Sequence, residues 1–276
     1  MFELPELTTI ARQMAEAIEG KAVAEGRLGN SPHKFVWYNL GHEEFAELTA
    51  GKRVGHPHAE GKWLFVPLEP DAMLLVGEWG GRILLHEASA TPPAKYHLYL
   101  AFEDGSAMSA TTQMWGGVGL FEHGRERDYE YVKHMRTQPS EPGFTWEYFV
   151  RLAEGARAGG KRSVKGLLTQ EGFVPGVGNA IAQDIMFRAG LHPRRDLAEL
   201  SELELRTLYD QIVATVVEAT TAGGRNDERD FFGNPGGYER IMHAKSAGQP
   251  CPRCGTTIVK MQYLGGACYL CPSCQV

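Results

Sequence analysis

The first 250 residues of the chain contain no cysteine, and all five cysteines lie in the last 26. A disulfide framework would distribute its cysteines along the chain, so this clustering favours metal binding instead. The sequence also lacks a run of about 20 apolar residues, which excludes a membrane-spanning helix, and it shows no secretory signal. These absences predict a cytoplasmic protein with no membrane partner.

The chain has no excess of positive charge, because 28 Lys and Arg stand against 34 Asp and Glu, for a formal net charge of −6. Phosphate binding depends mainly on Lys and Arg, so this balance counts mildly against a nucleic-acid partner. The acidic excess lies in residues 1–150, however, and the two signs are nearly balanced in 151–276. This shift, together with a length of 276 residues, favours more than one domain.

The first half of the sequence has the pattern of an N-terminal helix followed by short strands. Pro5 can occupy the first turn of the helix and Gly20 can end it. The apolar residues between them fall on one face at spacings of three and four: Leu7, Ile10, Met14 and Ile18. Five β-like runs follow at 63–68, 73–76, 82–86, 96–102 and 107–110, with a hairpin turn at 103–105. We expect a β-sandwich or flattened barrel with a helix at its N-terminus.

From about residue 145 the pattern becomes helical, with segments at 145–154, 164–169, 179–189 and 202–219. A glycine-rich stretch, 223–237, then connects the helices to the cysteine-rich tail. Stretches of this composition form loops, and we expect part of this one to be mobile.

The tail contains two C-x-x-C pairs, Cys251 with Cys254 and Cys271 with Cys274, separated by 16 residues. Four thiolates in two tight pairs suit the tetrahedral coordination of one structural zinc ion, and the residues between them can form a β-hairpin. The alternative, a chance cluster of reduced cysteines, does not account for the regular spacing. Cys268 is left over and is expected to pack inside the hairpin. A zinc ribbon alone does not decide between protein, RNA and DNA as partner.

Three separated motifs resemble the formamidopyrimidine-DNA glycosylase and endonuclease VIII family. They are Glu3-Leu4-Pro5-Glu6, then Pro175-Gly176-Val177-Gly178-Asn179 with Phe187-Arg188-Ala189-Gly190-Leu191-His192-Pro193, and the ribbon preceded by Gly248-Gln249-Pro250. The resemblance covers nearly the whole chain. It implies an α+β protein with an N-terminal β-sandwich (1–135), a helix-two-turn-helix domain (136–225), and a linker with a zinc finger (226–276).

The resemblance also implies a partner and a reaction. Members of this family bind damaged double-stranded DNA as monomers, in the cleft between their two halves. They flip the damaged nucleotide out of the duplex, cleave its glycosidic bond and usually break the strand. The chain is therefore expected to be a DNA repair protein of bacterial type, associated with the nucleoid when it is bound to DNA.

The chemical centre departs from the family pattern. The family's nucleophile is an N-terminal proline, whereas this chain has Phe2 at that position, so the free amine is expected to belong to Met1. Glu3 and Glu6 match the family's acidic pair, and Glu3 could assist at the sugar ring or orient a water molecule. The plainer interpretation is favourable charge at a helix N-terminus.

Several expected DNA contacts match the family pattern. Lys62 matches a lysine that approaches the phosphates from a hairpin. Gly176 and Gly178 can adopt positive φ and let the backbone approach a phosphate, and Asn179 opens the following helix.

Other recognition positions differ. The family fills the gap left by the flipped base with Met, Arg and Phe, which correspond here to Trp79, Met114 and Gly116, with Trp115 between the last two. The zinc-finger arginine becomes Gly266. The Tyr and Arg before the ribbon become His243 and Lys245.

Three functions remain open on this sequence. The first is a glycosylase that hydrolyses the glycosidic bond with a carboxylate-directed water and has weak or absent strand cleavage. The second is a glycosylase and lyase that uses the amine of Met1, a processed Phe2 amine or Lys62. The third is a protein that binds damaged DNA without cutting it.

Overall fold

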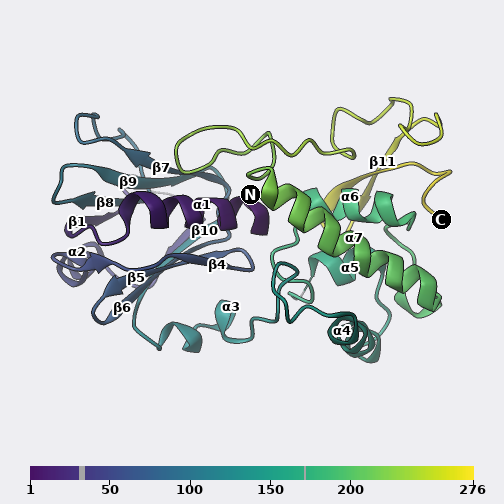
Figure 1. The fold of residues 1–276 in the computed structure, drawn as a ribbon, viewed down its shortest axis with the longest axis horizontal. Coiled ribbons are helices and arrows are strands. Elements are labelled where there is room, and N and C mark those ends of the chain that lie inside the picture. The colour runs from purple at the N-terminus through teal and green to yellow at the C-terminus, as the bar shows by residue number, and fades with distance from the viewer. Residues whose placement is uncertain (31–34, 171) are drawn as a thin grey trace. The chain divides into compact units, whose positions relative to one another are not determined.

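The computed structural model describes residues 1–30, 35–170 and 172–276, which divide into two compact units (Figure 1). The first unit comprises Met1–Met135 and Ala222–Gly237, and the second comprises Arg136–Thr221 and Tyr238–Val276. After residue 221 this division differs from the expected one, because the glycine-rich stretch belongs to the first unit. Among the described residues, no helix is long and apolar enough to cross a membrane.

The first unit is a β-sandwich with an N-terminal helix, as predicted. Its helices are α1 (Leu4–Ile18), α2 (His42–Thr49) and α3 (Glu130–Lys133), with a 3-10 turn η1 (Glu126–Asp128) before α3. Its strands are β1 (Val23–Leu28), β2 (Val36–Tyr38), β3 (Arg53–Val54), β4 (His58–Glu60), β5 (Trp63–Glu69), β6 (Ala72–Gly77), β7 (Gly81–His86), β8 (Leu98–Phe102), β9 (Ala107–Thr112) and β10 (Gly116–Glu122).

The strands form two sheets. One has the order β1-β8-β9-β7, and the other has the order β2-β10-β6-β5-β3 with β4 paired to β5. Alternate residues of each strand face the space between the sheets, as the twofold periodicity of a strand requires. In β5, for example, Leu64 and Val66 belong to the core between the sheets, while Trp63 and Phe65 belong to a cluster on the outer face.

Helix α1 contributes its apolar face to the same core (Figure 1). Leu7, Ile10, Met14 and Ile18 are all buried, as their spacing predicts. Pro5 lies in the first turn, where its missing N–H costs no hydrogen bond. The start of the chain is therefore fixed to the sandwich by one buried stripe.

Glycines make room for an aromatic cluster on the outer face of the larger sheet. The Trp63 ring lies over β6, where a Cβ built on Gly77 would be 2.0 Å from Trp63 Cδ2. The exposed ring of Trp37 stacks on Tyr129, with ring centroids 4.8 Å apart, and Trp63 meets Tyr129 edge-on. The space that the Trp63 ring occupies explains why β6 and β10 carry Gly77 and Gly117 at positions where strands usually carry larger residues.

Among its described residues, the second unit contains four helices and a hairpin. The helices are α4 (Trp146–Ala158), α5 (Val164–Thr169), α6 (Asn179–Ala189) and α7 (Glu202–Thr221), with a 3-10 turn η2 (Leu197–Glu199); the hairpin is β11 (Val259–Tyr263) and β12 (Gly266–Leu270). Ser163 caps α5 by accepting a hydrogen bond from the Gly166 N–H. Gly190 ends α6 in the left-handed region, with φ of 72°.

A buried carboxylate fixes α6 to the segment that leads into the hairpin. Asp184 accepts hydrogen bonds from the Tyr238 hydroxyl at 2.8 Å and from the backbone N–H groups of Ile241 and Met242. Burial raises the pKa of Asp184, and these donors oppose that effect. The network explains how residues after 237 are held against the helices of the second unit.

The close approach of the Trp63 ring to Gly77 can be tested by mutation. Changing Gly77 to Ala should destabilise the protein by about 1–3 kcal/mol, because the added methyl group overlaps the indole. Changing Gly155 to Ala is the control, since nothing lies within 4 Å of a Cβ there and helix propensity favours alanine. Urea unfolding of both variants would measure the difference, and equal stabilities would contradict the close approach.

Candidate active site and metal centre

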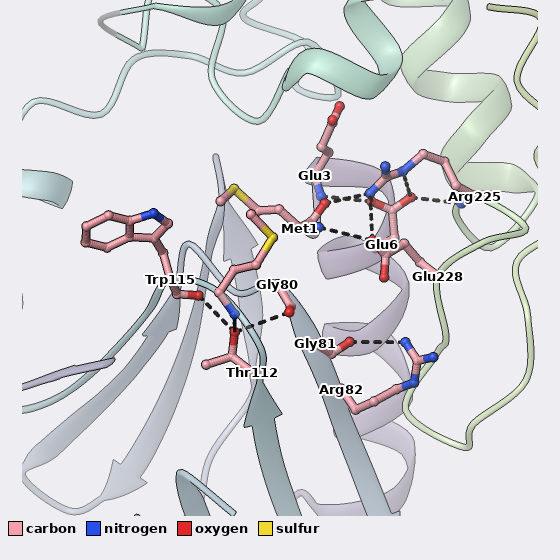
Figure 2. Close-up of polar contacts among 11 residues, drawn as sticks. Met1, Glu3, Glu6, Gly80, Gly81, Arg82, Thr112, Trp115, Arg225 and Glu228 are labelled. Carbon is pink, nitrogen blue, oxygen red and sulfur yellow. Dashed lines mark hydrogen bonds and ion pairs between the residues drawn. The ribbon is translucent and has the colours of Figure 1, made fainter. Parts of the chain in front are cut away.

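The N-terminal residue is held by side chains of the segment Ala222–Gly237, which we call the strap. The Met1 ammonium donates a hydrogen bond to Glu228 Oε1 at 3.2 Å, and the Met1 carbonyl accepts one from Arg225 Nη2 at 2.7 Å. Figure 2 shows both side chains reaching the N-terminus from the same side. Residue 1 is thus bound at its amine and at its carbonyl.

Phe2 occupies a structural position. Its side chain is fully buried in the core of the sandwich, and its backbone N–H donates to the Trp79 carbonyl at 2.8 Å. A peptide nitrogen engaged in this way is not a nucleophile. The expectation that Phe2 is a catalytic residue is therefore wrong for the chain that carries Met1.

Glu6 is fully occupied by hydrogen bonds. Its carboxylate accepts from the Glu3 backbone N–H at 2.8 Å, and from the backbone N–H, Nε and Nη2 of Arg225 at 2.8, 3.1 and 2.9 Å. Both side chains of the ion pair are about 95% buried, with exposed fractions of 3% and 5%. All four lone-pair directions of the carboxylate are used, so Glu6 positions its neighbours and is not available as an acid or a base.

Glu3 has a different orientation. It is the residue before the first turn of α1, and its backbone N–H binds Glu6, which fixes its place. Its side chain belongs to the capping box at the start of α1 and extends away from the Arg225 guanidinium (Figure 2). Of the two acidic residues in the N-terminal motif, Glu6 forms the ion pair with Arg225.

A cavity of about 220 Å³ opens beside the N-terminus within the first unit. Its lining includes Met1 and Glu228, together with Gly80, Gly81, Arg82, Thr111 and Gln113. Glycines at 80 and 81 allow close approach, and a Cβ at Gly81 would lie 1.9 Å from the Thr111 carbonyl oxygen. The N-terminal amine therefore borders a space that a small polar group can enter.

Lys62 lies at the tip of the β4–β5 hairpin. Gly61 before it has a φ of 58°, the left-handed conformation that the tight turn requires. The Lys62 carbonyl accepts a hydrogen bond from the Glu78 N–H at 3.1 Å, which fixes the hairpin tip to the neighbouring strand end. The side chain is half-buried.

The residues that correspond to the family's gap-filling positions fall into two groups. Met114 and Trp115 are 53% and 59% exposed on the loop before β10, and the Trp115 ring contacts Phe35 at 5.1 Å between centroids. Trp79, in contrast, is 1% exposed, and its indole N–H donates to the Thr111 carbonyl at 2.9 Å. Trp79 was expected at one of the positions that fill the gap left by the flipped base, but in this structure its ring fills the core. Gly116 cannot carry a larger side chain here, since its Cβ would meet the Trp79 ring at 2.7 Å.

The central motif places Asn179 at the exposed start of α6, where its Nδ2 donates to the Ala267 carbonyl at 3.2 Å. Gly176 has the anticipated positive φ, 76°, whereas Gly178 has a φ of −112° and does not need glycine for that reason. Gly266 lies beside Asn179, because a Cβ built on Gly266 would be 3.2 Å from Asn179 Oδ1.

Two further expected contacts lie before the hairpin. The His243 N–H donates to Ser246 Oγ at 3.0 Å, and Lys245 is exposed.

The four paired cysteines converge in the second unit. The sulfur atoms of Cys251, Cys254, Cys271 and Cys274 all lie within 4.8 Å of one another. The Cys251 to Cys274 separation is 3.9 Å and the Cys254 to Cys271 separation is 3.4 Å. Four thiolates at 2.3 Å from a tetrahedral ion are about 3.8 Å apart, so this arrangement fits one metal ion.

Cys268 lies outside this group. It is buried in β12 as expected, and Lys165 Nζ lies 3.3 Å from its sulfur.

Sequence reasoning missed Arg225 and Glu228. Both belong to the glycine-rich stretch that was expected to be a linker with a mobile loop, yet Arg225 and Phe231 are buried. The Phe231 N–H donates to Gln13 Oε1, and Gln13 Nε2 donates to Asp230. One signal could have revealed them: charged residues cluster at 225–230 inside a stretch of glycines. Such a cluster can indicate buried ion pairs, because a buried charge needs a partner from elsewhere in the chain.

The buried ion pair predicts a large asymmetry between the two acidic residues. Changing Glu6 to Gln should destabilise the protein by about 3–5 kcal/mol, because it removes the main partner of the buried Arg225 charge. Changing Glu3 to Gln should cost much less, and the double change of Glu6 to Gln and Arg225 to Met should cost less than the sum of the single changes. Chemical denaturation of the unchanged protein, the single Glu6, Glu3 and Arg225 variants and the double variant measures these costs; additive costs would show that the pair is not coupled.

Comparisons with known proteins agree with this fold. Residues 1–114 match the Formamidopyrimidine-DNA glycosylase N-terminal domain, and residues 137–229 match the Formamidopyrimidine-DNA glycosylase H2TH domain. The chain is 31% identical over its full length to all of a formamidopyrimidine-DNA glycosylase of Geobacillus kaustophilus, and 29% identical to one of Bacillus subtilis, covering 99% of it. Its fold is similar to that of Lactococcus lactis Fpg bound to DNA with an abasic site, with a TM-score of 0.83, 24% identity and 99% of each chain covered. The protein therefore belongs to the formamidopyrimidine-DNA glycosylase family.

Proposed function

We propose that this protein is a DNA glycosylase that binds damaged double-stranded DNA, flips the lesion out of the duplex and cleaves its N-glycosidic bond. The relatives that match over the full length carry the name formamidopyrimidine-DNA glycosylase. The observation that carries the proposal is the N-terminal site, where Met1 lines a cavity and Glu3 follows two residues later at the start of α1.

The proposed reaction is hydrolysis directed by Glu3, with weak or absent cleavage of the strand. Glu6 is saturated by Arg225, so Glu3 is the carboxylate that can orient a water or stabilise positive charge developing on the sugar. The usual secondary amine of the family is absent, because Phe2 is a buried peptide residue. In this mechanism a water oxygen bonds to the sugar C1′, the bond from C1′ to the base nitrogen breaks, and the base leaves with a proton.

A second candidate is a glycosylase that also acts as a lyase through the Met1 amine. It is favoured by one observation, the position of this amine on the lining of the cavity. Attack would require the amine to leave Glu228 and lose a proton, which costs the charge-assisted hydrogen bond.

DNA binding is proposed to involve groups from both units. In the first unit these are Lys62 on its hairpin and the exposed loop with Met114 and Trp115, whose side chains can stack against bases. In the second unit the candidates surround the start of α6 and the segment before the hairpin: Gly176, Gly178, Asn179, His243 and Lys245. The solved complex of Lactococcus lactis Fpg, which contains abasic-site DNA, supports a role of this fold in binding DNA.

The four-cysteine centre is proposed to hold one structural zinc ion. The sulfur separations fit tetrahedral coordination, and thiolate ligands select soft or borderline metals. A bound ion would hold the β11–β12 hairpin, including Gly266 and Ala267 beside Asn179, in place. Its function is structural, since all four coordination positions are filled by protein.

Metal analysis of the purified protein should give about one zinc per chain. Changing Cys271 to Ser should release the zinc, because it removes one of four ligands, whereas Cys268 to Ser should leave it bound. Release from the Cys268 variant alone would show that the ligand set is different.

An oligonucleotide assay that resolves base release from strand scission tests the reaction. The protein should release base from a lesion duplex without efficient strand cleavage, and Glu3 to Gln should reduce release by about 10²- to 10⁴-fold, as for loss of a general acid or base. Glu16 to Gln is the matched control, since it changes an exposed carboxylate of the same helix. Equal rates of release and scission would favour the lyase, and neither reaction across a broad lesion panel would favour a protein that only binds damage.

A further inference from the structure

The contacts of residue 1 suggest a function for Glu228. The Met1 amine donates to Glu228 Oε1, and the Met1 carbonyl accepts from Arg225, three residues earlier in the strap. Arg225 Nη2 also lies 3.4 Å from the same Glu228 oxygen. One short piece of the strap therefore determines where residue 1 lies and which way its amine points.

The strap is fixed to the rest of the first unit on both sides of Glu228. Arg225 is held by Glu6, and a Cβ on Gly224 would be 2.9 Å from the Glu6 side chain, so the strap passes close against α1. On the other side of Glu228, the buried Phe231 is fixed by Gln13 and its carbonyl accepts from the Leu85 N–H at 2.9 Å. Glu228 thus lies between two anchored points, and its side chain is 13% exposed.

We propose that Glu228 is a positioning residue that holds the Met1 amine away from attack on an aldehyde, and so keeps this glycosylase from forming a Schiff base. The inference rests on the proposed function for its DNA substrate, the ring-opened sugar of an abasic site. Schiff-base formation would join the amine nitrogen to C1′ of the aldehyde with loss of one water. The amine must present a lone pair to that carbon, and instead it is directed at Glu228 Oε1.

The orientation of the Met1 amine determines whether it can attack an aldehyde. Attack on carbon requires the reacting atoms to approach within about 3–3.5 Å with aligned orbitals. Two charge-assisted contacts, one at each end of residue 1, oppose the rotation that would bring the amine to this geometry. Removing the Glu228 charge releases the amine but keeps the Arg225 contact to the Met1 carbonyl.

The first experiment needs no DNA, so its outcome is independent of the proposed function. Protein with Met1 verified by intact mass is incubated with a small aldehyde and cyanoborohydride, which reduces the imine to a stable secondary amine. Peptide mapping then follows modification of the N-terminus relative to surface lysines. Glu228 to Gln should accelerate N-terminal modification by about tenfold, the change expected from losing one charge-assisted hydrogen bond. Asp227 to Asn is the control, because it removes the neighbouring exposed charge of the same strap.

The second experiment uses borohydride trapping on a duplex with a preformed abasic site, in a background of Lys62 to Ala. Glu228 to Gln should raise the yield of covalent adduct about tenfold, with the adduct on the N-terminal peptide and with unchanged affinity for the DNA. Glu228 to Asp keeps the charge and shortens the reach, so its yield should lie between those of the two proteins. A variant that failed to fold would lose its affinity for the DNA, so misfolding would not produce a higher yield of adduct at unchanged affinity.

An unchanged or reduced N-terminal reactivity of the Glu228 to Gln protein in both experiments would overturn the proposal. A reduced yield in particular would mean that Glu228 accepts the amine proton and assists attack. Failure of the proposed glycosylase would show instead as absence of base release from lesions, while the reactivity towards the small aldehyde still reported on Glu228.

Discussion

The buried ion pair between Arg225 and Glu6 is the interaction on which the arrangement of the N-terminal site depends. It joins groups 219 residues apart, and it places both the first turn of α1 and the strap. Burial of two charges is costly, and the pair tolerates it because the Glu6 carboxylate receives four hydrogen bonds and Arg225 also binds the Met1 carbonyl. Any change that moves the strap therefore moves residue 1.

Much of the fold could be predicted because its signals are local. The start of α5 follows from Ser163, the start and end of α6 follow from Asn179 and Gly190, and the strands β5 to β9 follow from alternation and turn residues. The strands β1 to β4 and β10 were missed. In β10 three glycines lower the strand propensity, and their reason is the aromatic rings packed over them, which only the folded sheet brings together.

The site was predictable where residue type and spacing decide the chemistry. Two C-x-x-C pairs are sufficient to predict the thiolate cluster, because the ligands of each pair are neighbours in sequence. Burial, in contrast, could not be read from residue type. Trp79 has the size of a wedge residue but supports the core, and Arg225 has the appearance of a linker residue but is among the least exposed charges of the described chain. Their partners come from distant segments, which no local pattern reveals.

The binding of Met1 has a practical consequence for how the protein is produced. An affinity tag or a residual cleavage scar before Met1 replaces an ammonium, which has three N–H donors and a full charge, with an amide that has one donor and no charge. The contact with Glu228 would then be lost or altered, and added residues would enter the cavity lined by Met1, Gly80 and Gly81. Reactivity measured on tagged protein would describe a different N-terminus, so comparisons between preparations need identical first residues.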